Sequence, residues 1–148
     1  MFRLSMLGVS LVLAATLIAP ALAASEEEVM DQIENLQGDS VGFGEFFGKL
    51  QDAFLLDDHA SFADLVAFPI TIHANGETYD VDTADTFTEN FDSLLAPQTQ
   101  EAIRSQDFKD LFVNAEGVMI ADGAVWMSNI CDNDACSKTY WAVTAINN

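Results

Sequence analysis

Basic residues are scarce in this sequence. Of its 148 residues 5 are Lys or Arg, against 24 Asp or Glu, which gives a formal net charge of −19. Proteins bind nucleic acid and anionic lipid through Lys and Arg side chains that neutralise phosphate groups. A chain this acidic repels both, so we exclude nucleic acid and anionic lipid as partners. The same acidity favours solubility and can steer a cationic partner toward the protein.

Histidine and the common catalytic motifs are also scarce. The chain has 2 histidines, and it lacks a GxSxG nucleophile motif, a Gly-rich phosphate loop and a His-rich zinc motif. Ser128 and Ser137 therefore have no sequence context typical of a hydrolase. We exclude hydrolases and nucleotide-dependent enzymes on this ground, and we expect no cofactor.

Carboxylates are abundant, but their spacing does not match a metal-binding motif. Asp80, Asp82 and Asp85 are close enough in sequence to share a calcium ion, yet the segment lacks the glycine and the terminal glutamate of an EF-hand. Capping of a helix explains these carboxylates more simply. The segment Asp132–Asp134 consists of ordinary turn residues. We therefore expect no metal site.

Cysteine occurs only as Cys131 and Cys136. In an exported protein such a pair favours a disulfide. A ring this small stabilises the fold by about 2 kcal/mol in the chain-entropy model, so we expect it to fix the tip of a hairpin. Two thiolates without a nearby histidine do not complete a zinc site, and the spacing differs from the CxxC motif of redox pairs.

The long apolar run of the chain lies at its N-terminus. Arg3 precedes the apolar segment Met6–Ile18, and Pro20 is followed by the small-residue site Ala21-Leu22-Ala23. This layout is typical of a secretory signal peptide, so we expect residues 1–23 to be removed. An uncleaved membrane anchor is the alternative, because the run approaches the roughly 20 residues that a spanning helix needs.

Residues 24–148 then form the mature protein. Their number suits a single domain with one hydrophobic core. Arg3 leaves with the signal peptide, so 4 basic residues remain against 24 acidic ones and the net charge becomes −20. We expect this domain to be periplasmic or secreted, and free of the membrane after cleavage.

The first half of the mature chain has helical periodicity. Ser25 and Glu28 form a capping box at the start of a helix that ends near Gly38. Phenylalanines then recur at helical spacing from Phe43 to Phe54 and indicate a core helix. A third, short helix should begin at Asp57 or Asp58, carry residues 62–66 and end before residue 69, and further helical segments are expected over 83–96 and 99–105.

Strand patterns follow and alternate with these helices. Ile70–His73 and Thr78–Val81 flank Asn75-Gly76, which is the strongest short signal for a β-hairpin. An antiparallel meander is expected near the C-terminus, with strands over 108–114, 117–121, 124–130 and 138–146. The pattern predicts an α+β fold in which helices cover one face of a curved antiparallel sheet.

Two apolar motifs resemble those of a known family. They are Ala63-Asp64-Leu65-Val66-Ala67-Phe68-Pro69-Ile70 and the run from Gly117 to Met127. From about Phe43 to its C-terminus, the chain resembles small exported members of the nuclear-transport-factor-like superfamily. This superfamily includes polyketide-cyclase-like enzymes and many members without known activity. The resemblance implies a cone in which N-terminal helices close over a bent sheet around a pocket, but it assigns no catalytic residue to this chain.

Four residues are candidates for the lining of such a pocket. His73 alternates with two isoleucines, so it lies on the other face of its strand, and its imidazole is suited to proton transfer near neutral pH. Tyr79, Trp126 and Trp141 combine an aromatic ring with one polar atom. Such side chains serve equally well in a ligand pocket and in a core.

These observations favour a non-catalytic exported binding domain. Its ligand is a small apolar molecule in the pocket, or a cationic protein or peptide on the acidic exterior. The alternative is a small cofactor-independent lyase, isomerase or cyclase, which requires His73 inside a cavity beside a carboxylate. A third hypothesis is an acidic inhibitor of a basic wall-degrading enzyme such as a lysozyme. Because dimers across the sheet are common in the superfamily, a homodimer is a further hypothesis.

Overall fold

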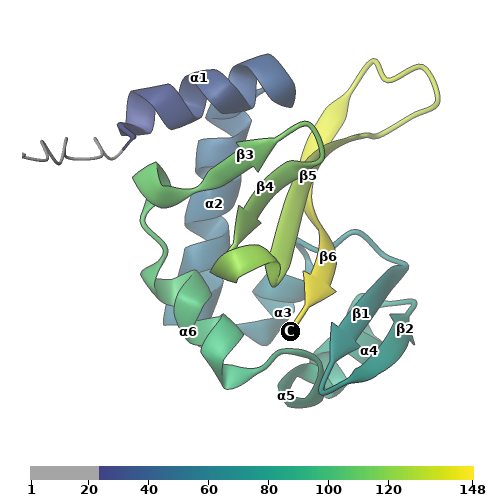
Figure 1. Cartoon of the computed structure of the whole chain (residues 1–148). Helices are drawn as coiled ribbons and strands as arrows, with labels where there is room; N and C mark the ends of the chain where they lie inside the picture. The colour runs from purple at the N-terminus through teal and green to yellow at the C-terminus, as the bar shows by residue number, and fades with distance from the viewer. Residues whose placement is uncertain (1–23) are drawn as a thin grey trace, which may run out of the picture.

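The computed structural model describes residues 24–148 and has an α+β architecture (Figure 1). The α-helices are α1 (Glu26–Leu36), α2 (Ser40–Leu55), α3 (His59–Ala63), α4 (Ala84–Glu89), α5 (Phe91–Leu94) and α6 (Pro97–Ser105). The strands are β1 (Ile70–Ala74), β2 (Glu77–Val81), β3 (Phe112–Asn114), β4 (Gly117–Ile120), β5 (Val125–Cys131) and β6 (Thr139–Asn147). Two short 3-10 helices are η1 (Phe108–Asp110) and η2 (Ala121–Gly123).

The strands form one mixed sheet that does not close on itself. Their order is β2-β1-β6-β5-β4-β3, and each neighbouring pair is antiparallel except β1 and β6, where Ile72 lies opposite Ile146 in parallel register. The prediction of a wholly antiparallel sheet is therefore wrong at this pair. The parallel contact joins the early hairpin to the last strand of the chain, and a pairing over such a distance leaves no local pattern in the sequence.

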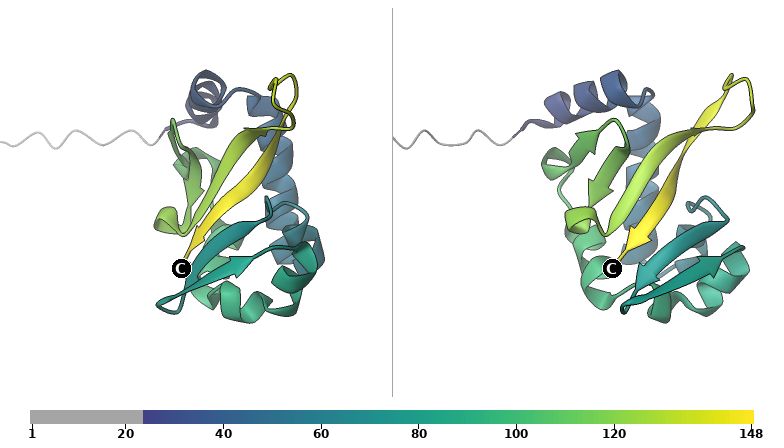
Figure 2. Two further views of the ribbon diagram at one scale, coloured as in Figure 1. Left: turned by 90° about the vertical axis from the view of Figure 1, so that its right-hand side faces the viewer. Right: turned by 45° about the vertical axis from the view of Figure 1, so that its right-hand side comes forward.

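The long helix α2 packs along one face of the sheet, and α1 crosses the end of α2 (Figures 1 and 2). The stripe predicted for α2 is the centre of the core, because Phe43, Phe46, Phe47, Leu50 and Phe54 are at most 6% exposed. The sheet contributes alternate residues to the same core. In β1 the buried positions are 70, 72 and 74, as the predicted alternation requires.

Several local predictions are confirmed. Ser25 Oγ accepts a hydrogen bond from the Glu28 amide, and the Glu28 carboxylate accepts one from the Ser25 amide, which completes the capping box. Gly38 follows α1 with φ 72° and ends the helix in a left-handed conformation. Asn75 and Gly76 have φ values of 54° and 77°, which is the backbone of a two-residue hairpin turn.

Two helical predictions need correction. The third helix ends at Ala63 instead of extending to Val66, because Val66 forms a β-bridge with Val143 of β6. The segment expected as one helix over 83–96 is divided into α4 and α5. Asn90, at the division, has φ −113° and donates its side-chain Nδ2 to the Thr86 carbonyl. Tertiary pairing and a local side-chain bond therefore override helical periodicity at these positions.

None of the helices formed by residues 24–148 has the length and apolar character needed to cross a membrane. The expected signal peptide, residues 1–23, lies outside the described residues. Export of the mature chain therefore stays a prediction from the sequence.

Candidate functional site

Aromatic side chains fill the space between the helices and the sheet. Phe43 of α2 packs on Trp141 of β6 with ring centroids 4.7 Å apart. Phe54 and Phe62 have the same centroid separation, and Phe62 also contacts Phe87 of α4. Each of these side chains is at most 7% exposed. This region is therefore a packed core.

His73 lies on the solvent side of β1. Its neighbours Ile72 and Ala74 are buried, whereas His73 is exposed. Its Nδ1 atom lies 3.0 Å from the hydroxyl oxygen of Thr78 on the adjacent strand. None of the carboxylates in residues 24–148 forms an ion pair with it. A lyase base has to be enclosed beside a carboxylate. His73 is exposed and has no carboxylate partner among these residues, so it does not meet this requirement.

Tyr79 and Trp126 lie in separate surroundings. Tyr79 is half-buried on β2, and its hydroxyl donates a 2.8 Å hydrogen bond to the Glu77 carboxylate, which raises the pKa of the phenol. It lines a hollow of about 210 Å³ between β2 and the α4–α5 segment. Trp126 is half-buried on the sheet face away from α2, where it pairs with Met119 of β4.

Trp141 is the candidate that lines a hollow beside α2. It is 7% exposed, and its indole Nε1 donates a 3.1 Å hydrogen bond to the main-chain carbonyl of Asp39. Its ring packs against Phe43 and Phe46 of α2. The part of the ring that is not covered lines a surface groove beside α2. The four sequence candidates therefore do not converge on one pocket.

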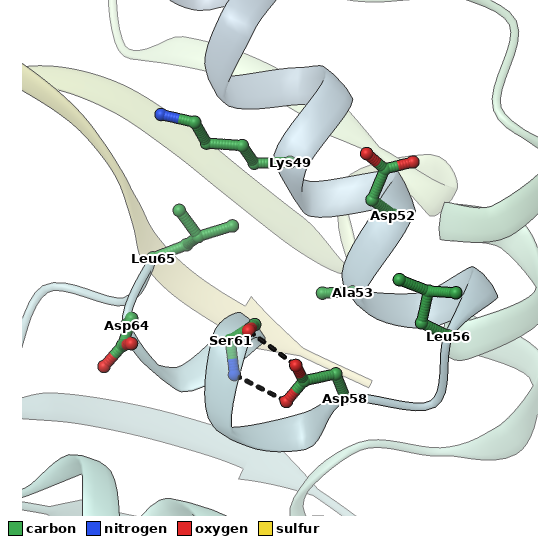
Figure 3. Close-up of a pocket in the computed structure, with 8 residues that line it drawn as sticks. All are labelled: Lys49, Asp52, Ala53, Leu56, Asp58, Ser61, Asp64 and Leu65. Atoms are coloured by element: carbon green, nitrogen blue, oxygen red, sulfur yellow. Dashed lines mark hydrogen bonds between the residues drawn. The ribbon is translucent and has the colours of Figure 1, made fainter.

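This groove, which we call the α2 groove, runs along α2 and was not predicted from the sequence. Its first hollow has a volume of about 320 Å³ and lies between α2 and α3 (Figure 3). Three carboxylates line it, Asp52 from α2 and Asp58 and Asp64 from the two ends of α3. Leu56 and Leu65 supply apolar surface. The hollow thus combines negative charge with an apolar lining.

A second hollow of about 210 Å³ continues the groove toward the start of α2. Lys49 and Leu65 line both hollows, so the two are adjacent. Asp39 and Glu45 add carboxylates here, and Trp141 supplies apolar surface. In total 5 carboxylates and 1 ammonium group line the α2 groove.

One stripe of α2 forms a wall of the groove. Glu45, Lys49 and Asp52 of α2 and its C-terminal cap Leu56 follow one another at intervals of four, three and four residues. Residues at this spacing lie above one another on the same face of a helix. The spacing is visible in the sequence, but the sequence does not show that α3 and β6 lie opposite this stripe.

Asp58 has a structural role as well as a place in the groove. Its carboxylate accepts a 3.0 Å hydrogen bond from the Ser61 amide and a 2.7 Å bond from the Ser61 hydroxyl (Figure 3). These bonds lower the pKa of Asp58, so its charge persists at neutral pH. Asp52 and Asp64 are exposed, and their interactions with a charged partner therefore depend on salt.

Lys49 is the cation of the groove, and the part of the chain that the structure describes gives it no carboxylate partner. Arg104 lies within 3.8 Å of the Asp57 carboxylate, and Lys109 lies 3.1 Å from that of Asp107. In residues 24–148, no carboxylate oxygen lies within 4.0 Å of the Lys49 ammonium. Figure 3 shows that the Lys49 side chain extends away from Asp52.

The sheet face away from α2 has a row of apolar side chains. Phe112, Met119, Trp126 and Ala145 lie side by side on β3, β4, β5 and β6. Phe112 is 50% exposed, and the other three are partly exposed. The other outward positions of these strands carry no charged residue. They include Asn114, Gly117, Ser128, Ile130, Tyr140 and Ala142.

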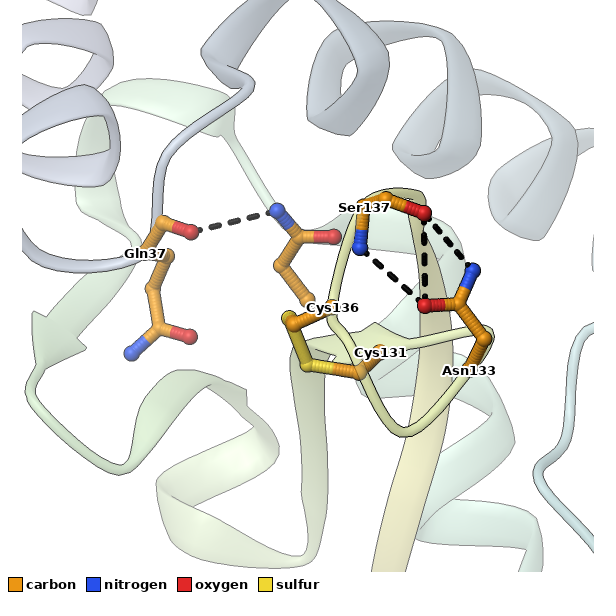
Figure 4. Close-up of a disulfide and its surroundings, with 6 residues drawn as sticks. Gln37, Cys131, Asn133, Cys136 and Ser137 are labelled. Atoms are coloured by element: carbon orange, nitrogen blue, oxygen red, sulfur yellow. Dashed lines mark hydrogen bonds between the residues drawn. A yellow bond between two sulfur atoms is a disulfide. The ribbon is translucent and has the colours of Figure 1, made fainter.

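The β5–β6 hairpin extends beyond the rest of the sheet, and its tip is closed by the predicted disulfide (Figures 1 and 4). Cys131 and Cys136 form this bond, which confirms the prediction. Asn133 accepts hydrogen bonds from the amide and the hydroxyl of Ser137 and so holds the loop together. Residues 131–140 are exposed throughout. The disulfide and the hydrogen bonds within the loop therefore fix the shape of the tip.

Residues 24–148 contain no group of three or more His, Cys, Asp or Glu side chains placed to hold a metal ion. In the comparisons with known proteins, no protein-family model, curated protein or solved structure matches the chain. The function is therefore inferred from the geometry of this molecule.

Proposed function

We propose that this protein is an exported, non-catalytic binding domain that holds a cationic segment of another protein or peptide in the α2 groove. The observation that carries the proposal is the combination of 5 carboxylates and apolar side chains in two adjacent surface hollows beside α2. Carboxylates select Lys and Arg side chains, and the apolar lining accepts their methylene stems or adjacent apolar residues.

The expected affinity is moderate. An exposed ion pair contributes about 0–1 kcal/mol, so several such pairs together with a small apolar contact give weak to moderate binding. The net charge of −20 acts over a longer range and raises the rate of encounter with a cation by a factor of about 10 to 1,000 at low salt. Binding therefore weakens as the salt concentration rises.

The nuclear-transport-factor-like fold is part of this proposal. Six strands with helices on one face support it, and so does the irregularity between Trp126 and Met127, because a β-bulge of this kind bends a strand. In such a cone a small ligand lies between helices and sheet. Here that space contains phenylalanine rings, which favours surface binding over a small apolar ligand and over a lyase.

Export to the periplasm or medium also belongs to the proposal. The N-terminal segment and the disulfide between Cys131 and Cys136 support an oxidising compartment. An acidic inhibitor of a basic wall-degrading enzyme, such as a lysozyme, is one form of the same function. In that form the cationic segment in the groove belongs to the surface of a folded enzyme.

A homodimer is a second proposal, and the apolar row on the outer sheet face favours it. Two copies that each carry a net charge of −20 repel one another. This repulsion is weakest when the two contacting faces carry no charged side chains. The outward positions of β3 to β6 form such a face. Phe112 and Trp126 would supply the apolar contact of a two-fold interface. The α2 groove lies on the other side of the sheet and stays open in this dimer.

The groove is tested by fluorescence anisotropy with a labelled peptide of alternating lysine and alanine. The triple variant Glu45→Gln, Asp52→Asn, Asp64→Asn removes three groove charges and leaves the Asp58 cap intact. We expect it to weaken binding about tenfold, which corresponds to about 1.4 kcal/mol.

The matched control is the triple variant Asp122→Asn, Asp132→Asn, Asp134→Asn, which changes the net charge equally at exposed positions outside the groove. We expect it to weaken binding less than about threefold, because only the long-range attraction is reduced. Equal effects of both triple variants would mean that net charge, and not the groove, governs binding.

A further inference from the structure

We infer that Lys49 makes the α2 groove selective for segments in which an acidic residue lies between two basic residues. This inference rests on the proposed function and concerns the choice among cationic ligands. It arises from the position of one ammonium group in a groove that is otherwise lined by carboxylates.

Lys49 divides the negative charge of the groove into two parts. Asp39 and Glu45 line the hollow on one side of it. The three other carboxylates, those of Asp52, Asp58 and Asp64, line the hollow on the other side. The charges along the groove therefore alternate as negative, positive and negative. A ligand whose charges alternate in the opposite sense complements this pattern at each of the three places.

The Lys49 ammonium is available to such a ligand. No carboxylate in residues 24–148 lies within 4.0 Å of it, in contrast to Arg104 and Lys109. An acidic side chain of the ligand can therefore pair with Lys49 without displacing a partner. A ligand with basic residues alone brings a like charge toward this ammonium, which disfavours its binding.

The spacing suits an extended ligand. At a rise of about 1.5 Å per residue, Glu45 and Asp52 lie about 10 Å apart along the axis of α2, with Lys49 between them. In an extended peptide, alternate side chains point to the same side and are about 6.6 Å apart. The sequence Lys-x-Glu-x-Lys thus presents its three charges over about 13 Å, and the flexible lysine stems accommodate the difference.

A double-mutant cycle tests this inference. The ligands are two capped peptides, Ala-Lys-Ala-Glu-Ala-Lys-Ala and the same peptide with Gln in place of Glu. The proteins are the wild type, Lys49→Gln and, as a matched control, Lys138→Gln, which removes an exposed ammonium outside the groove. Dissociation constants are measured by NMR titration at low salt.

In the wild type and in Lys138→Gln we expect the Glu peptide to bind at least as tightly as the Gln peptide, although it carries one positive charge less overall. In Lys49→Gln we expect the preference to move about fivefold toward the Gln peptide. An unchanged ratio in Lys49→Gln would overturn the inference and leave the proposed function in place. Failure of both peptides to bind the wild type would contradict the proposed function itself.

Discussion

The indole Nε1 of Trp141 in β6 donates a 3.1 Å hydrogen bond to the main-chain carbonyl of Asp39, the residue that caps α2. Asp39 in turn accepts a 3.0 Å bond from the Gly42 amide in the first turn of α2. The start of α2 is thereby fixed to the sheet. Both residues also line the α2 groove, so this bond positions one end of the proposed binding surface.

The Trp141 bond can be tested by the variant Trp141→Phe, which keeps an aromatic ring and removes Nε1. The Asp39 carbonyl then loses a partner in a partly buried place, and we expect the free energy of unfolding to fall by about 1–2 kcal/mol. Urea denaturation measures this change. The control is Trp126→Phe, which alters a half-buried indole on the outer sheet face. An equal loss in both variants would mean that ring size, and not the bond, is responsible.

Replacing both Cys131 and Cys136 by serine should destabilise the fold without affecting the groove. The disulfide closes a short loop, so we expect a loss of about 2 kcal/mol in the free energy of unfolding. The hairpin tip lies outside the lining of the groove. Peptide affinity at 25 °C should therefore equal that of the wild type. A reduced affinity of the folded variant would show that the tip takes part in binding.

The charge of Asp58 should make the stability of α3 dependent on pH. Hydrogen bonds from Ser61 lower its folded-state pKa below the ordinary value of 3.8. The contribution of the ionised carboxylate is therefore present above pH 3.8 and is lost as the pH falls through the lowered pKa. Asp58→Asn keeps a capping side chain that does not titrate. We expect the stability difference between wild type and variant to shrink from pH 6 to pH 2, and a constant difference would contradict this.

The proposed dimer interface on the outer sheet face can be tested by introducing a charged residue there. Phe112 is 50% exposed at the end of the apolar row, so Phe112→Lys should leave the fold intact and separate the proposed dimer into monomers. Val41 on α2 is 69% exposed and lies outside this face, so Val41→Lys is the control and should stay dimeric. Sedimentation equilibrium measures both. A wild type that is monomeric at 100 μM would contradict the dimer.

Much of the fold could be predicted because its signals are local. The Ser25–Glu28 capping box, the Asn75-Gly76 turn and the Cys131–Cys136 pair each involve residues a few positions apart. The phenylalanine stripe of α2 is equally local, because a helix fixes which residues share a face. Each of these features depends on residues that are close to one another in the sequence, so the sequence alone specifies them.

The features that bring distant segments together could not be predicted in this way. The parallel contact of β1 with β6 and the bridge between Val66 and Val143 leave no periodic pattern in the sequence. The α2 groove depends on the same contacts, because α3 and β6 form its second wall. Of the four predicted pocket residues, only Trp141 lines this groove. In the sequence, the acidic residues of α2 look like those of an ordinary solvated helix face. Only the position of α3 and β6 opposite them shows that they line a groove.

Binding of a cationic segment in the α2 groove can be mapped by an NMR titration of the 15N-labelled mature protein with the lysine–alanine peptide. In this titration, amide shifts identify the contact surface. We expect shifts that cluster on α2 and its C-terminal cap, from Glu45 to Leu56, and at Ser61, Asp64 and Leu65, and that disappear as salt is added. Shifts confined to the β5–β6 tip or the outer sheet face, or scattered over the whole acidic surface, would contradict binding in this groove.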